Sequence, residues 1–153
     1  MSDKGQLFVV GTPIGNLEDI TLRAISTLQN VDTILAEDTR NSKKLLDAHN
    51  INTKMISYHD HSSEKEIKKI VGLLLEGEDL ALISDAGTPT ISDPGYGLIR
   101  DCINHDISII PIPGASSITA AMSISGLPSD SFTFFGFLPQ KKGRLKKINQ
   151  LKE

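Results

Sequence analysis

Apolar residues follow two alternating patterns along the chain. Short, mostly apolar runs, which predict buried β-strands, occur at 7–10, 31–36, 54–58, 79–83 and 107–112. Between them, apolar residues recur every three or four positions, as in amphipathic helices, at 21–29, 42–49, 63–75 and 95–104. Strands that alternate with helices form crossover units and a parallel sheet. Residues 1–113 are therefore predicted to form one complete α/β domain with five mostly parallel strands.

Two of these helices carry more detailed expectations. In the first, Leu22, Ile25 and Leu28 share one face, which should pack against the sheet. Ahead of the third, Ser63 is followed three residues later by Glu66, which is the spacing of a capping box. The helix at 63–75 is therefore the most firmly predicted element of the chain.

Residues 114–153 show a different organisation. Helices are predicted at 116–125 and 141–151, with a single strand at 132–137 between them. One strand cannot close a hydrophobic core of its own. We therefore expect these residues to be the start of a truncated second α/β domain, and we favour a chain cut from a longer protein. The alternative is that these elements dock on the first domain.

The composition excludes several classes of protein. A single cysteine, Cys102, excludes an internal disulfide framework and a multi-cysteine zinc site. Its place inside a predicted helix indicates a small core residue. No apolar run is long enough to span a membrane, and residues 1–6 lack the pattern of a signal peptide. We expect a cytoplasmic protein that does not associate with membranes.

The charge is unevenly distributed. The whole chain has a net charge of −3, with −8 on residues 1–140 and +5 on residues 141–153. A basic stretch can attract phosphate, although a solvated helix face is the more common explanation. The acidic body argues against a general nucleic-acid-binding surface on residues 1–140.

Four loops follow predicted strands, at 11–16, 37–40, 84–97 and 111–117, and three of them are rich in glycine and proline. Ligands of open parallel sheets bind at these strand ends. Ser116 and Ser117 begin a helix there, so they offer hydroxyls and backbone N–H groups to an anion. The nucleoside-triphosphate P-loop and the dinucleotide glycine fingerprint are both absent. His59 and His61 are more simply two exposed loop histidines than half of a metal site, so no metal is expected.

The same loops carry a family resemblance. The strings are VGTPIGNLEDI at 10–20, AEDTR at 36–40, SDAGTPTISDPG at 84–95 and PGASS at 113–117, and the match continues at 127–139. Together they resemble the tetrapyrrole-methylase superfamily. Within it, they are most similar to the branch that methylates small-subunit ribosomal RNA. The resemblance extends from residue 7 to about residue 147.

The resemblance implies a homodimer that binds S-adenosylmethionine between two α/β domains. It also implies methylation of a cytidine ribose 2′-hydroxyl in small-subunit (16S) ribosomal RNA. Carried over motif by motif, the cofactor-binding residues would be Pro13, Ile14, Gly15, Gly87, Thr88, Pro89, Ile91, Ser116 and Ser117. Family members are nearly twice as long as this chain, so the fragment itself could be inactive.

A ribose hydroxyl is a weak nucleophile and would gain from a general base. Glu37, Asp38 and Asp85 stand at strand ends facing the expected cleft, and Asp38 is equally suited to capping the following helix. Arg40 shows no obvious local partner in the sequence, so we expect it to hold a substrate phosphate. Two alternatives stay open. One is a methyltransferase of this fold with a tetrapyrrole or other small acceptor, and the other is a non-catalytic domain that binds a nucleotide or RNA.

Overall fold

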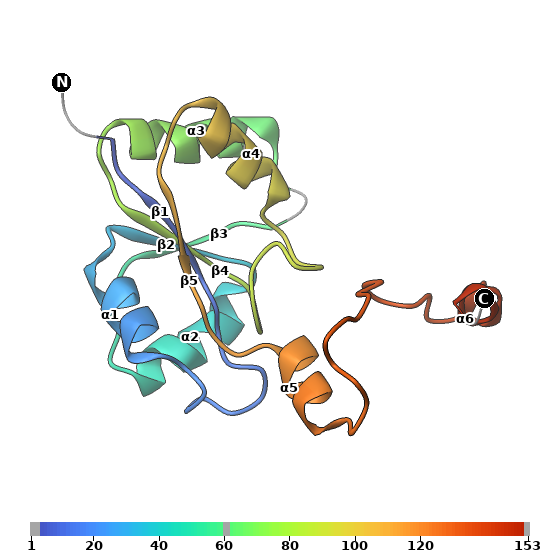
Figure 1. The fold of residues 1–153 in the computed structure, drawn as a ribbon. Helices are drawn as coiled ribbons and strands as arrows, with labels where there is room; N and C mark the ends of the chain where they lie inside the picture. Colours follow the sequence, from blue (N-terminus) through green and yellow to red (C-terminus); the bar gives the residue numbers. More distant parts are fainter. Residues whose placement is uncertain (1–3, 60–61, 152–153) are drawn as a thin grey trace.

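The computed structural model describes residues 4–59 and 62–151. Its centre is one five-stranded sheet in the order β3-β2-β4-β1-β5 (Figure 1). The strands are β1 (Leu7–Val10), β2 (Thr33–Ala36), β3 (Met55–Ser57), β4 (Leu80–Ile83) and β5 (Ile109–Ile112). Every pairing between them is parallel. The predicted five-stranded α/β fold is confirmed.

Helices cover both faces of the sheet, because the connections from β1 to β3 run across it in one direction and those from β3 to β5 run in the other. Right-handed crossovers in opposite directions place their helices on opposite faces. The helices α1 (Leu22–Asn30) and α2 (Thr39–Ala48) lie on one face, and α3 (Glu64–Leu75) and α4 (Tyr96–Asn104) lie on the other (Figure 1).

Successive residues of a strand alternate between the two faces, and this alternation divides the core into two clusters. Ile34 of β2 packs with Leu28 and Leu46 on the α1–α2 face. The next residue, Leu35, packs with Leu74 and Leu98 on the α3–α4 face. Cys102 of α4 is fully buried in this second cluster, as predicted.

The sequence predicted the start of α3 correctly, but it predicted the buried face of α1 only in part. Ser63 and Glu66 form the predicted capping box at the start of α3. In α1, however, the expectation for Leu22 is wrong, because its side chain is 86% exposed. Ala24 and Leu28 occupy the buried stripe. At 3.6 residues per turn, Leu22 lies about 200° around the helix from Ala24, so it faces away from the sheet.

Beyond β5, the structure contains α5 (Ser117–Ile124) and α6 (Arg144–Gln150), neither of which has a buried residue. The strand expected at 132–137 is wrong, since this segment carries no strand assignment. A strand needs backbone hydrogen bonds to a neighbour, and the sheet that the structure describes consists of β1 to β5. After α5 the chain leads away from the sheet to α6 (Figure 1). The division into domains at residue 113 stays a prediction.

Candidate cofactor site at the strand ends

Hydrogen bonds of Thr12 connect the loop after β1 to the loop after β4. Its backbone N–H donates to the Gly87 carbonyl at 2.8 Å, and the Gly87 N–H donates back to the Thr12 carbonyl at 3.1 Å. The buried Thr12 hydroxyl also donates to the Ser84 carbonyl at 3.1 Å. These bonds fix the first and third of the predicted loops side by side.

The loop after β5 joins them through two glycines. The Gly11 N–H donates to the Ile112 carbonyl at 2.9 Å. A Cβ on Gly11 would lie 2.8 Å from the Gly114 nitrogen, and one on Gly114 would lie 2.8 Å from the Gly11 carbonyl oxygen. Only glycine at both positions lets the two backbones approach this closely.

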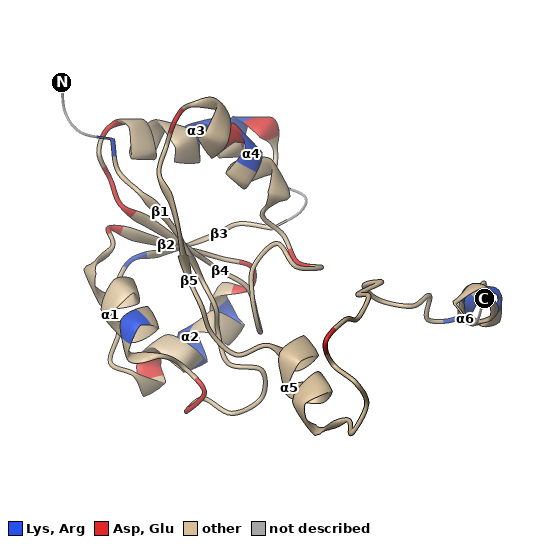
Figure 2. Cartoon of the chain, viewed as in Figure 1, with Lys and Arg blue, Asp and Glu red and all other residues tan. Residues whose placement is uncertain are grey.

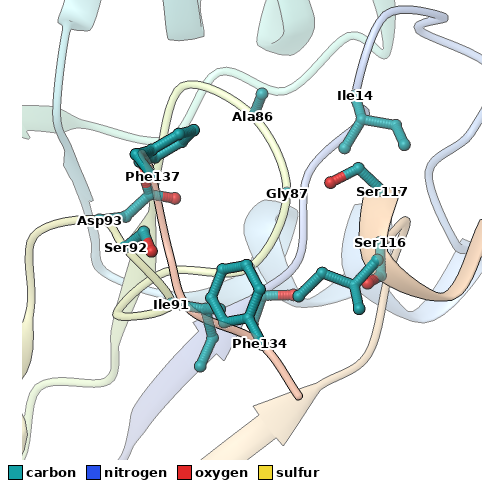
Figure 3. A pocket seen from close by; sticks show the side chains of 12 residues that line it. Ile14, Ala86, Gly87, Ile91, Ser92, Asp93, Ser116, Ser117, Phe134 and Phe137 are labelled. Carbon is teal, nitrogen blue, oxygen red and sulfur yellow. The ribbon is translucent and has the colours of Figure 1, made fainter. Parts of the chain in front are cut away.

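These three loops and the segment after α5 enclose a cavity of about 350 Å³ (Figure 3). Its volume is within the usual range for small-molecule sites. Six of the nine predicted cofactor residues line it, namely Ile14, Gly87, Thr88, Ile91, Ser116 and Ser117. Pro13, Gly15 and Pro89 are not among the lining residues, and each is the chain neighbour of one. The structure therefore brings four separate motifs to one cavity.

Other lining residues were not singled out from the sequence: Ala86, Ser92, Asp93, Ile118, Phe134 and Phe137. Ser92 and Asp93 stand inside the glycine-rich string at 84–95, so the motif indicated the segment but not the side chains. Figure 3 shows Asp93 and Phe137 across the cavity from Ile14 and Ser117. Phe134 and Phe137 belong to the segment 132–137, whose pattern predicts a strand and does not indicate which side chains line a cavity.

The loop that forms one wall of the cavity has an unusual backbone. Gly87 has φ of +81°, which suits glycine, but Thr90 and Ser92 also have positive φ values of +74° and +62°. Such a conformation is a genuine outlier for a β-branched residue. The Thr90 N–H donates to the Pro94 carbonyl at 3.3 Å, which helps to hold this turn.

A second group of predicted residues meets at the start of α2. The Asp38 carboxylate caps the helix by accepting the Arg40 N–H at 2.8 Å. It also accepts Arg40 Nε at 3.2 Å and Nη2 at 2.8 Å, which makes a bidentate ion pair. These hydrogen bonds lower the pKa of Asp38 to about 2, and the carboxylate raises the pKa of Arg40. The expectation that Arg40 lacks a local partner is therefore wrong, although its side chain is 89% exposed.

Asp85 belongs to the same group. Its Oδ1 accepts the Asp38 N–H at 3.2 Å, and its Oδ2 accepts Asn41 Nδ2 at 3.0 Å. Glu37 is half-buried between β2 and α2. None of the four candidate catalytic residues is among those that line the cavity. They form a neighbouring cluster, which lies next to the cavity because Asp85 directly precedes Ala86, one of the lining residues.

Two further observations concern alternatives raised by the sequence. Within the described residues, no three His, Cys, Asp or Glu side chains gather as metal ligands, and no helix is long and apolar enough to cross a membrane. His59 is exposed, and His61 is outside the described residues.

Known proteins are similar to this chain in sequence, and solved structures are similar to it in fold. Ribosomal RNA small subunit methyltransferase I of Halalkalibacterium halodurans is 54% identical over 151 residues, which are 98% of this chain and 52% of that protein. Its namesake in Thermotoga maritima is 49% identical over 149 residues, 97% of this chain and 67% of that protein. The chain thus spans about half to two thirds of the length of these relatives.

Among solved structures, uroporphyrin-III-C-methyltransferase from Thermus thermophilus matches with a TM-score of 0.60 and 22% identity, over 82% of this chain and 53% of that one. A conserved hypothetical protein from Aeropyrum pernix K1 matches with a TM-score of 0.64 and 20% identity, over 85% of this chain and 46% of that one. At such identities the likeness concerns the fold alone. The sequence profile of the Tetrapyrrole (Corrin/Porphyrin) Methylases matches residues 6–153. The chain belongs to the tetrapyrrole methylase family.

Proposed function

We propose that the chain is part of an S-adenosylmethionine-dependent methyltransferase that methylates a cytidine ribose 2′-hydroxyl in small-subunit ribosomal RNA. The observation that carries the proposal is the cavity at the strand ends, where four sequence motifs meet. The names of the relatives at about 50% identity support the choice of RNA as acceptor. The family resemblance supports a cytoplasmic homodimer.

The residues of the cavity suit the cofactor. Ser116 is the N-cap of α5 and its side chain makes no capping hydrogen bond, so first-turn N–H groups are available for the methionine carboxylate. Gly87 leaves room for close backbone approach, and Ile14, Ile91 and Phe134 offer apolar surface to the adenine ring. S-adenosylmethionine supplies a methyl group already activated on a sulfonium. The protein mainly has to align the acceptor.

The cluster beside the cavity suits the acceptor RNA. The exposed guanidinium of Arg40, held by Asp38, can present its remaining N–H groups to a phosphate. Glu37 and Asp38 remain candidates for a base, whereas both oxygens of the third candidate, Asp85, already accept hydrogen bonds from the protein. Basic residues gather at the far end of the chain (Figure 2) and can contact the RNA backbone. They are Lys141, Lys142, Arg144, Lys146 and Lys147.

Calorimetric titration of S-adenosylmethionine tests the cofactor part. It would use this chain and a chain extended to the length of its relatives. Ser117→Asp puts a carboxylate at the first position of α5, where it favours the helix but repels the cofactor carboxylate. We expect affinity to fall at least about tenfold, the effect of opposing one like charge. Ser117→Asn, which has nearly the size of aspartate but no charge, is the matched control.

Binding by neither chain would overturn the methyltransferase proposal and favour the non-catalytic domain. The acceptor is tested by transfer of radiolabelled methyl groups from the extended chain to small ribosomal subunits. Transfer to a tetrapyrrole with none to RNA would overturn the choice of substrate.

A further inference from the structure

The helices α2 and α3 begin with related caps that are completed in different ways. In α3, the third helical residue, Glu66, accepts the N–H of the N-cap residue Ser63 at 2.6 Å. In α2, the N-cap is Asp38 and the third residue is Asn41, and the Asp38 N–H is bonded to Asp85 instead. Asp85 thus takes the place of the glutamate in a capping box, although it is 47 residues away in the sequence.

Asn41 holds this substitute in place. Its side-chain amide donates to Asp85 Oδ2 at 3.0 Å, while Asp85 Oδ1 accepts the Asp38 N–H. The arrangement depends on the sheet. Since β2 and β4 are parallel neighbours with Ala36 beside Ile83, the residues two positions beyond each strand, Asp38 and Asp85, also come together.

The position of Asp85 connects the two halves of the site. Ala86 and Gly87, the next residues, line the cavity, and Asp38 on the other side of the bond holds Arg40. Both oxygens of Asp85 already accept hydrogen bonds from the protein. We propose that Asp85 is a positioning residue that completes the cap of α2 and so holds the Ala86–Gly87 wall of the cavity against the helix that presents Arg40. Its effect on methyl transfer rests on the proposed function, whereas its effect on the loop does not.

Three variants separate positioning from helix capping and from general-base catalysis. Asp85→Ala removes both hydrogen bonds. Asp85→Ala with Asn41→Glu supplies a local capping box to α2, of the kind that Glu66 completes in α3, but leaves the loop untied. Asp85→Asn with Asn41→Asp reverses the donor and the acceptor across the contact, so that the tie is kept while position 85 loses its carboxylate.

Amide hydrogen exchange reports the tie directly. The Gly87 N–H, bonded to the Thr12 carbonyl, reports the loop, and the Ser42 N–H, bonded to the Asp38 carbonyl, reports the start of α2. In Asp85→Ala we expect exchange at both amides to accelerate roughly tenfold, the scale of one lost hydrogen bond. The local capping box should restore protection at Ser42 only. The reversed pair should restore protection at both.

The rate of methyl transfer by the extended chain should change in parallel with the protection of the Gly87 amide. We expect a low rate in the first two variants and a recovered rate in the reversed pair. Full recovery of methyl transfer in the variant with the local capping box would show that Asp85 serves only to cap α2, which would overturn the proposal. A reversed pair that regains protection but stays inactive would identify Asp85 as a catalytic carboxylate, which also overturns it. If the wild-type extended chain transfers no methyl group, the proposed function fails, and the exchange data alone decide whether Asp85 ties the loop.

Discussion

Replacing Gly114 by alanine should destabilise the protein through the backbone contact between the loops after β1 and β5. The new Cβ would lie 2.8 Å from the Gly11 carbonyl oxygen, against 3.4 Å for the shortest ordinary contact, a shortfall of 0.6 Å. All three nearest atoms belong to the Gly11 backbone, which is itself bonded to Ile112. The two loops must therefore separate.

Overpacking of this kind costs about 2–3 kcal/mol of the free energy of unfolding. For a chain of this size, that corresponds to a fall in Tm of roughly 4–12 °C. The matched control is Gly72→Ala in the middle of α3, where an added Cβ meets nothing within 4 Å. Alanine there removes backbone freedom from the unfolded chain and should raise stability by about 0.5–1 kcal/mol.

Urea unfolding followed by circular dichroism measures both changes. The midpoint should fall for Gly114→Ala and rise for Gly72→Ala, with the slope m unchanged. A Gly114→Ala protein that unfolds at or above the wild-type urea concentration would refute the close approach of the two loops. It would also remove the reason for glycine in the string at 113–117.

Three further predictions concern single groups. The Asp38 carboxyl should titrate near pH 2 by NMR, below the ordinary 3.8, so its stabilisation of α2 is complete above pH 3.8 and is lost as the pH falls through about 2. In Arg40→Ala the pKa should rise but stay below 3.8, because the backbone N–H of residue 40 still donates to the carboxylate; an unchanged titration would contradict the role of the guanidinium. Ser63→Ala should lower the free energy of unfolding by about 1 kcal/mol through loss of the capping box, and an unchanged urea midpoint would contradict this. Burial raises the pKa of the Cys102 thiol to about 11, so a thiol reagent at pH 8 should react quickly only after unfolding in urea; rapid reaction of the folded chain would contradict its burial.

Much of the fold follows from local patterns. The five apolar runs became the five strands because a strand covered by helices on both faces must be apolar on both sides. The capping box at Ser63 is equally local, since both partners are within one turn. Loops rich in glycine and proline at strand ends predicted where the cavity forms, because the carboxyl ends of parallel strands meet at one edge of the sheet.

Other features depend on partners that the local sequence does not specify. Periodicity grouped Leu22 with Leu28, but the side of α1 that faces the sheet is decided by how the helix docks. The aromatic segment at 132–137 has the composition of a strand, yet a strand forms only beside another. Arg40 had a partner two residues away that the sequence could have suggested, because an N-cap aspartate can also accept a guanidinium.

The hydrogen bond between Asp38 and Asp85 shows most clearly what the sequence determined and what depended on the tertiary structure. The sequence determined that a helix starts near residue 39 and that a loop follows the strand at 79–83. It contained no indication that Asp85, in the loop after β4, would complete the cap of α2. That depends on the strand order β3-β2-β4-β1-β5, which places β2 beside β4. Only the assembled sheet brings together groups 47 residues apart, because a hydrogen bond depends on distance in space and not on separation along the chain.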